Sequence, residues 1–177
     1  MTLKFTLFST EVEDFVLELM IDANKTFADL QALILKACNY QEYMGHRFYL
    51  CNEDWRPKTR ILQEDDGTVD TDEDLLLMDE TVLGDYLEDE GQHLAYRFDP
   101  DNKRMFLIEL SETIFGNRLP EGKVNRRHGQ APDQILFEDE PEVKPQTTSE
   151  EIGEEFYGDD GFEEEEIDME GFGIEEN

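Results

Sequence analysis

The hydrophobic period of the chain changes twice within the first fifty residues, and this change limits the folds that it can adopt. Residues 3–7 and 15–21 alternate apolar with other side chains, which is the period of two expected of half-buried strands. Residues 26–38 instead repeat apolar side chains at steps of three and four, which is typical of an amphipathic helix. The alternation returns at 46–51. We therefore predict an α+β fold with a β-grasp-like ββαβ start, in which the helix packs across the sheet.

Local signals mark where these elements begin and turn. Thr26 and Asp29 occupy the two positions of a helix capping box, and the short polar segment between the first two strands suits an antiparallel hairpin. Residues 92–110 alternate on both sides of a turn that contains Pro100. This alternation predicts a late β-hairpin that completes a mixed sheet.

The remaining segments of the body carry weaker patterns. Residues 52–80 break the regularity, and we expect a surface excursion with one short strand, anchored by Trp55 and the leucines. Residues 81–87 suggest a helix of one or two turns. From residue 111 the periodicity fades and prolines and glycines accumulate, so that 111–137 is predicted to be a loop-like arm.

A strongly acidic segment closes the chain. Residues 138–177 contain 18 Asp and Glu residues against the single Lys144, and they carry more than half of the net charge of −31. Charge of one sign at this density repels itself, and isolated apolar residues cannot offset the entropy of ordering. We therefore predict one folded domain over 1–137 and a disordered acidic tail over 138–177.

Sparse apolar side chains interrupt this acidic tail. Four of them are candidate anchors for a partner: Phe156, Phe162, Phe172 and Ile174. Carboxylates would supply long-range attraction to a basic surface, and the anchors would supply short-range contact. A tail that only keeps the chain in solution is the competing interpretation.

Several chemistries find no support in the sequence. Cys38 and Cys51 have only His46 between them, which is too few ligands at close spacing for zinc. No serine lies in a nucleophile elbow, and no glycine-rich phosphate loop follows a strand. We predict no catalytic, cofactor or metal residues. The sequence has no long apolar run, so we expect no membrane segment and a cytoplasmic location.

Basic side chains gather in one place just before the acidic tail. They are Arg118, Lys123, Arg126, Arg127 and His128. This basic strip is either the ordinary charge balance of a loop or a docking strip for an anion, which could include the chain's own tail. A net charge of −31 opposes approach to nucleic-acid phosphates, so we do not expect a nucleic-acid partner.

Motifs spread over residues 1–135 resemble those of one family. They are the opening LKFTLFS, the helix start Thr26–Leu30, the stretch His46–Phe48, Leu83–Leu87 and the strand Tyr96–Asp99. In this order they are similar to the plasmid pRiA ORF-three-like family, some of whose members are labelled TnpR-like passenger proteins of insertion elements. The resemblance implies an α+β domain and an association with mobile elements, without an established reaction.

The chain departs from this family at one turn. Family members usually carry an Asp-Phe-Gly-Asp-Asp-Trp type turn followed by a histidine, whereas residues 98–102 read Phe-Asp-Pro-Asp-Asn. If that turn carries the family's activity, the chain has altered it or lost it.

Together these features favour a non-enzymatic protein-interaction module. Its sheet or groove would bind a protein partner, and its acidic tail would tune contacts to basic partners. The alternative is a nucleic-acid-associated accessory of transposition that acts through the basic strip at 118–128. An enzyme with a carboxylate or histidine site is a third hypothesis, but we find no catalytic motif in the sequence that supports it.

Overall fold

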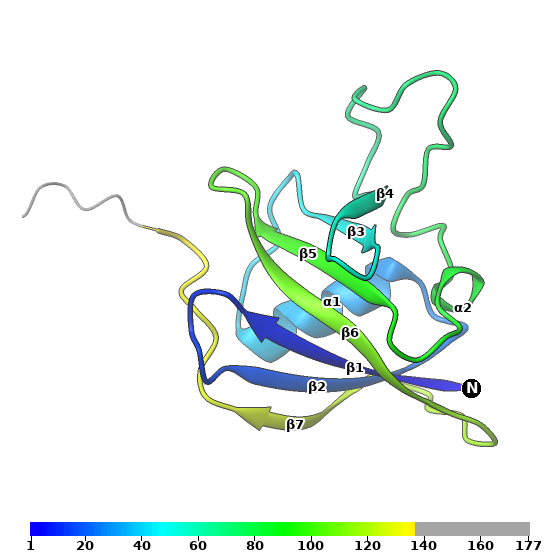
Figure 1. The fold of residues 1–177 in the computed structure, drawn as a ribbon, viewed down its shortest axis with the longest axis vertical. Coiled ribbons are helices and arrows are strands. Elements are labelled where there is room, and N and C mark those ends of the chain that lie inside the picture. The colour runs from blue at the N-terminus through cyan, green and yellow to red at the C-terminus, as the bar shows by residue number, and fades with distance from the viewer. Residues whose placement is uncertain (137–177) are drawn as a thin grey trace, which may run out of the picture. The chain divides into compact units, whose positions relative to one another are not determined.

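The computed structural model describes residues 1–136, which form a β-sheet with a long helix across one face (Figure 1). The elements are β1 (Thr2–Ser9), β2 (Val16–Asp22), α1 (Phe27–Cys38), β3 (Arg47–Cys51), β4 (Pro57–Leu62), α2 (Leu83–Tyr86), β5 (His93–Asp99), β6 (Arg104–Ile114) and β7 (Lys123–His128). The seven strands form one sheet in the order β4-β3-β5-β6-β1-β2-β7.

All strand pairs in this sheet are antiparallel, which corrects the prediction of a mixed sheet. The early hairpin β1–β2 and the late hairpin β5–β6 are confirmed, and β1 joins the two by pairing with β6. A parallel contact does occur at an isolated bridge between Leu62 and Leu77, outside the ladders of the sheet. The ββαβ order of the first elements is therefore present, while a β-grasp architecture stays a prediction.

Helix α1 begins and ends as the sequence predicts. The Thr26 hydroxyl accepts a hydrogen bond from the Asp29 amide at 3.2 Å, and the Asp29 carboxylate accepts one from the Thr26 amide at 3.0 Å. Asn39 adopts the left-handed conformation with φ of 58° and ends the helix. The apolar face of α1 packs on one face of the sheet, where the rings of Phe27 and Phe48 are 5.4 Å apart.

The core lies between α1 and this inner face of the sheet. Alternate residues of each long strand are buried there, including Leu3, Phe5, Leu17, Tyr96 and Phe106. The residues between them point to the outer face, which no helix covers in Figure 1. The inner face therefore supplies the apolar burial, and the outer face is left for polar and charged side chains.

The arm predicted as a loop from residue 111 is in part strand. β6 continues through Ile114, and β7 pairs with β2 at the edge of the sheet. All six residues of β7 are exposed. Its sequence therefore lacks the alternation of apolar and polar side chains by which a half-buried strand is predicted. The predicted tail at 138–177 lies outside the described residues. Within residues 1–136, no helix is long and apolar enough to cross a membrane.

Candidate functional site

The basic strip of the sequence forms the edge strand β7. One side of β7 pairs with β2, and no strand of the described chain pairs with its other side. The register shifts between Glu18 and Leu19, and this β-bulge leaves Asn125 without a partner residue on β2. The free side presents unpaired backbone donors and acceptors, which is where a further strand can add.

The charges of β7 divide between the two faces of the sheet. Asn125 and Arg126 both donate to the Glu18 carboxylate, at 2.9 and 3.1 Å, so that Glu18 partly neutralises Arg126. Arg127 lies opposite Leu17, which is a residue of the inner face. Within residues 1–136, Lys123 and Arg127 make no ion pair.

Arg127 also acts on the end of α1. Burial raises the pKa of the Cys38 thiol to about 12, and the positive charge of Arg127 opposes that rise only in part. Cys38 is therefore a protonated core thiol and not a nucleophile at neutral pH.

The residues of the predicted strip lie on and before β7. Lys123, Arg126 and Arg127 lie on the strand, while Arg118 precedes it and lines a hollow with Asp22 and Lys25. The other four candidate residues, Phe156, Phe162, Phe172 and Ile174, lie outside the described residues.

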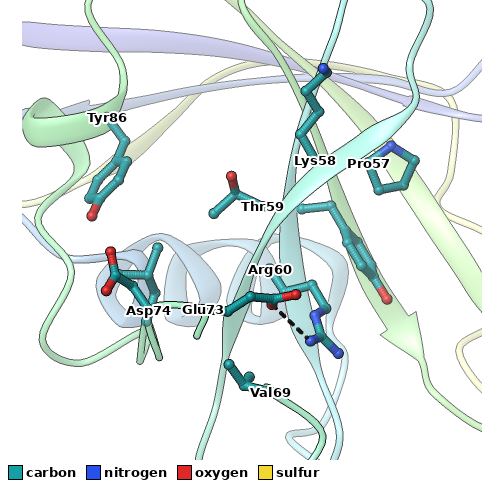
Figure 2. A pocket seen from close by; sticks show the side chains of 10 residues that line it. Pro57, Lys58, Thr59, Arg60, Val69, Glu73, Asp74 and Tyr86 are labelled. Carbon is teal, nitrogen blue, oxygen red and sulfur yellow. Dashed lines mark hydrogen bonds and ion pairs between the residues drawn. The ribbon is translucent and has the colours of Figure 1, made fainter. Parts of the chain in front are cut away.

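A groove of about 650 Å³ lies beside β4, at the opposite edge of the sheet (Figure 2). Figure 2 shows Thr59 and Tyr86 on its walls and the ion pair between Arg60 and Glu73, whose atoms are 3.3 Å apart. The acidic excursion after β4 supplies Glu73 and Asp74, so that positive and negative side chains share this groove. Sequence analysis missed it because its walls come from segments that are far apart in the chain.

Arg104 is the best-connected charged residue of the described chain. Its guanidinium donates to Glu11 at 2.6 and 2.7 Å and to Asp99 at 3.1 Å. It also donates to the carbonyl oxygens of Asp133 and Gln134. Arg104 thus joins the turn at 98–102 to the segment that precedes the predicted tail.

The histidines of the sheet are engaged by aromatic partners. His46 is buried and its Nδ1 lies 2.7 Å from the Tyr96 hydroxyl, while burial lowers its pKa. His93 stacks on Trp55 with ring centroids 3.7 Å apart. Within residues 1–136, no group of three or more histidine, cysteine or acidic residues is arranged to hold a metal ion.

Comparison with known proteins places the chain in a family. The family model for plasmid pRiA4b ORF-3-like protein matches residues 3–131. The chain belongs to this family. The match spans β1 to β7 of the chain and ends before the predicted acidic tail.

Other comparisons add the fold alone. No curated protein matches this pRiA4b ORF-3-like protein. The crystal structure of a protein of unknown function, MM3350 from Methanosarcina mazei Go1, is similar to it with a TM-score of 0.52 and 18% sequence identity. The similarity covers 69% of this chain and 67% of that chain.

Proposed function

We propose that this pRiA4b ORF-3-like protein is a non-enzymatic protein-interaction module that receives an extended acidic segment of a partner protein along β7. The observation that carries the proposal is an edge strand whose six residues are all exposed and of which four are Lys, Arg or His. Its backbone can extend the sheet by one strand, and its side chains prefer an acidic strand as the addition.

The positive charges of β7 would attract acidic strands of a partner and would also exclude basic ones. Lys and Arg on an edge strand, together with a β-bulge, oppose pairing with basic or neutral strands. Lys123 and Arg127 have no carboxylate partner in the described chain and remain able to pair with an incoming acidic side chain. Arg126, which is held by Glu18, contributes less.

The predicted tail belongs to the same proposal. Its 18 acidic residues would contact basic regions of the partner, and Phe156, Phe162, Phe172 and Ile174 would anchor it. The association with mobile elements and the cytoplasmic location also remain proposals, and the first is supported by the plasmid in the family's description.

A peptide-binding experiment with the full chain tests the role of β7. A fluorescent peptide of alternating Glu and Val is titrated at low salt, next to a peptide with Gln in place of Glu. We expect the acidic peptide to bind more tightly, and Lys123→Glu with Arg127→Glu to weaken it severalfold, because each change places like charges side by side. Binding is expected to weaken as salt screens the charges.

Lys36→Glu with Arg56→Glu is the matched control, since both side chains are exposed outside β7 and together they change the net charge by as much as the β7 variant does. Equal binding by wild type and the β7 variants would contradict the proposal. If Lys58→Glu abolished binding instead, the groove beside β4 would be the peptide site.

The alternative, a nucleic-acid-associated accessory of transposition, predicts a different outcome. The β7 variants would then lose salt-dependent binding of duplex DNA rather than of the acidic peptide. One feature weighs against it: the Glu18 carboxylate engages Arg126 and partly neutralises its charge.

A further inference from the structure

Two arginines face each other across neighbouring strands far from β7. Arg47 of β3 and Arg97 of β5 are directly opposite in the ladder. Their chain neighbours Phe48 and Tyr96 are buried on the inner face, so the alternation of the strands places both arginines on the outer face. Like charges directly opposite each other destabilise a sheet. An anion bound between or above the two arginines would reduce this repulsion.

The described chain supplies too few anions for this pair. Arg47 donates from Nη2 to Asp66 at 3.1 Å, while its Nε is buried and has no hydrogen-bond partner within residues 1–136. Arg97 makes no ion pair there, and its Nε is also buried without a partner. Its guanidinium carbon instead lies 5.4 Å from the centre of the Tyr49 ring.

We propose that Arg47 and Arg97 form an oxyanion site that holds the carboxylate or phosphate group of a small ligand. The Nη atoms of a guanidinium can donate in one plane to the oxygens of such a group, whereas both Nε atoms are buried against the protein. Two guanidinium groups stand on neighbouring strands, and the ring of Tyr49 orients one of them. This inference does not depend on the role proposed for β7.

A cleft beside Arg47 gives room for the rest of the ligand. Residues 44–47 and 62–66 line a space of about 320 Å³. Met44 stands at this cleft with 79% of its surface exposed, and Leu62 contributes a second apolar wall. Glu64, Asp65 and Asp66 also line this cleft, so a ligand with one oxyanion on a small apolar body fits it better than a ligand with a second negative charge.

Nuclear magnetic resonance of the arginine side chains tests the site in the full chain. The Nε–Hε signals are followed during titration with inorganic phosphate, with sodium benzoate and with sodium chloride at equal ionic strength. We expect saturable shifts of the Arg47 and Arg97 signals with at least one of the first two probes. Tighter binding of phosphate would identify a phosphate ligand, and tighter binding of benzoate a carboxylate with an apolar body.

Variants separate the site from general attraction to positive charge. Arg97→Lys keeps the charge and removes the planar guanidinium group, so we expect binding to weaken about tenfold through the loss of a charge-assisted hydrogen bond. Met44→Glu, at an exposed position that tolerates substitution, brings a negative charge to the cleft and should weaken both probes. Arg126→Lys on β7 is the matched control and should bind as wild type does. Shifts that do not saturate or that chloride reproduces would overturn the proposal, and so would unchanged binding by both Arg97→Lys and Met44→Glu.

Discussion

Arg104 shows how one buried charge fixes three distant segments of the chain. It is 8% exposed and holds Glu11 from the β1–β2 turn, Asp99 from β5 and the carbonyl oxygens of residues 133 and 134. Removing one partner of a buried ion pair leaves the others without compensation. The penalty is larger than the net worth of the pair itself.

We therefore expect Arg104→Met to lower the free energy of unfolding by about 3 kcal/mol. Urea unfolding of the variant and the wild type measures this change. Arg56→Met is the control, because Arg56 is exposed in the β3–β4 turn and its replacement should cost less than about 0.5 kcal/mol. A similar small loss for Arg104→Met would show that water, and not the protein, satisfies Glu11 and Asp99.

His46 makes the stability of the fold depend on pH. Burial lowers its pKa below 6.5, although the Glu42 and Asp99 carboxylates oppose that shift, and Tyr96 and Tyr43 are its aromatic neighbours. Below pH 6.5 the unfolded chain therefore binds a proton that the folded chain refuses, and stability falls until the pH reaches the folded pKa.

Unfolding curves from about pH 7 to about pH 5 check this expectation. His46→Gln removes the titrating group, so its stability should fall less over this range than that of wild type. His93→Gln is the comparison, because it removes a histidine that is only partly buried. Parallel curves for wild type and His46→Gln would show that other groups cause the dependence.

At the scale of elements, β7 depends on a close approach at its end. Gly129 follows the strand with φ of 74°, and a Cβ built there would lie 2.8 Å from the backbone oxygen of Asp14. The chain directly after β7 can therefore approach the β1–β2 turn this closely only because residue 129 has no side chain.

We expect Gly129→Ala to destabilise the protein by about 2 kcal/mol or more, from the left-handed backbone and the collision together. Gly67→Ala is a matched control, since Gly67 has φ of 76° but nothing within 4 Å of the added carbon. Thermal unfolding gives the difference between the two variants, and hydrogen exchange at residues 123–128 shows whether β7 separates. Equal costs would mean that the approach to Asp14 is not tight.

For the whole molecule, the sequence predicts best those parts that bury one face. Alternation locates β1, β2 and the β5–β6 hairpin, and the capping box locates the start of α1. The sequence does not predict β7, because all its side chains are exposed and its pairing depends on backbone atoms that every residue has. The order of strands along the chain does not give their neighbours in the sheet, which is why an antiparallel sheet was predicted as mixed.

Sites that combine distant segments were harder to predict than the elements. Arg104 lies in register with Phe106 and Ile108, so its alternation alone could have indicated an inward charge. Its partners in residues 11 and 133–134 are separated from it by many residues and leave no local signal. The same holds for Arg47 and Arg97, whose proximity depends on the register of β3 against β5.

The central place of β1 has a consequence for biosynthesis. During synthesis β1 can pair with β2 soon after both have emerged, but the other edge of β1 stays open until β6, about a hundred residues later, is available. Pairings between such distant segments slow folding, because a long loop must close before they form. During translation the nascent β1–β2 hairpin therefore keeps an unpaired strand edge, and we expect the chain to be most prone to wrong strand pairing in this interval.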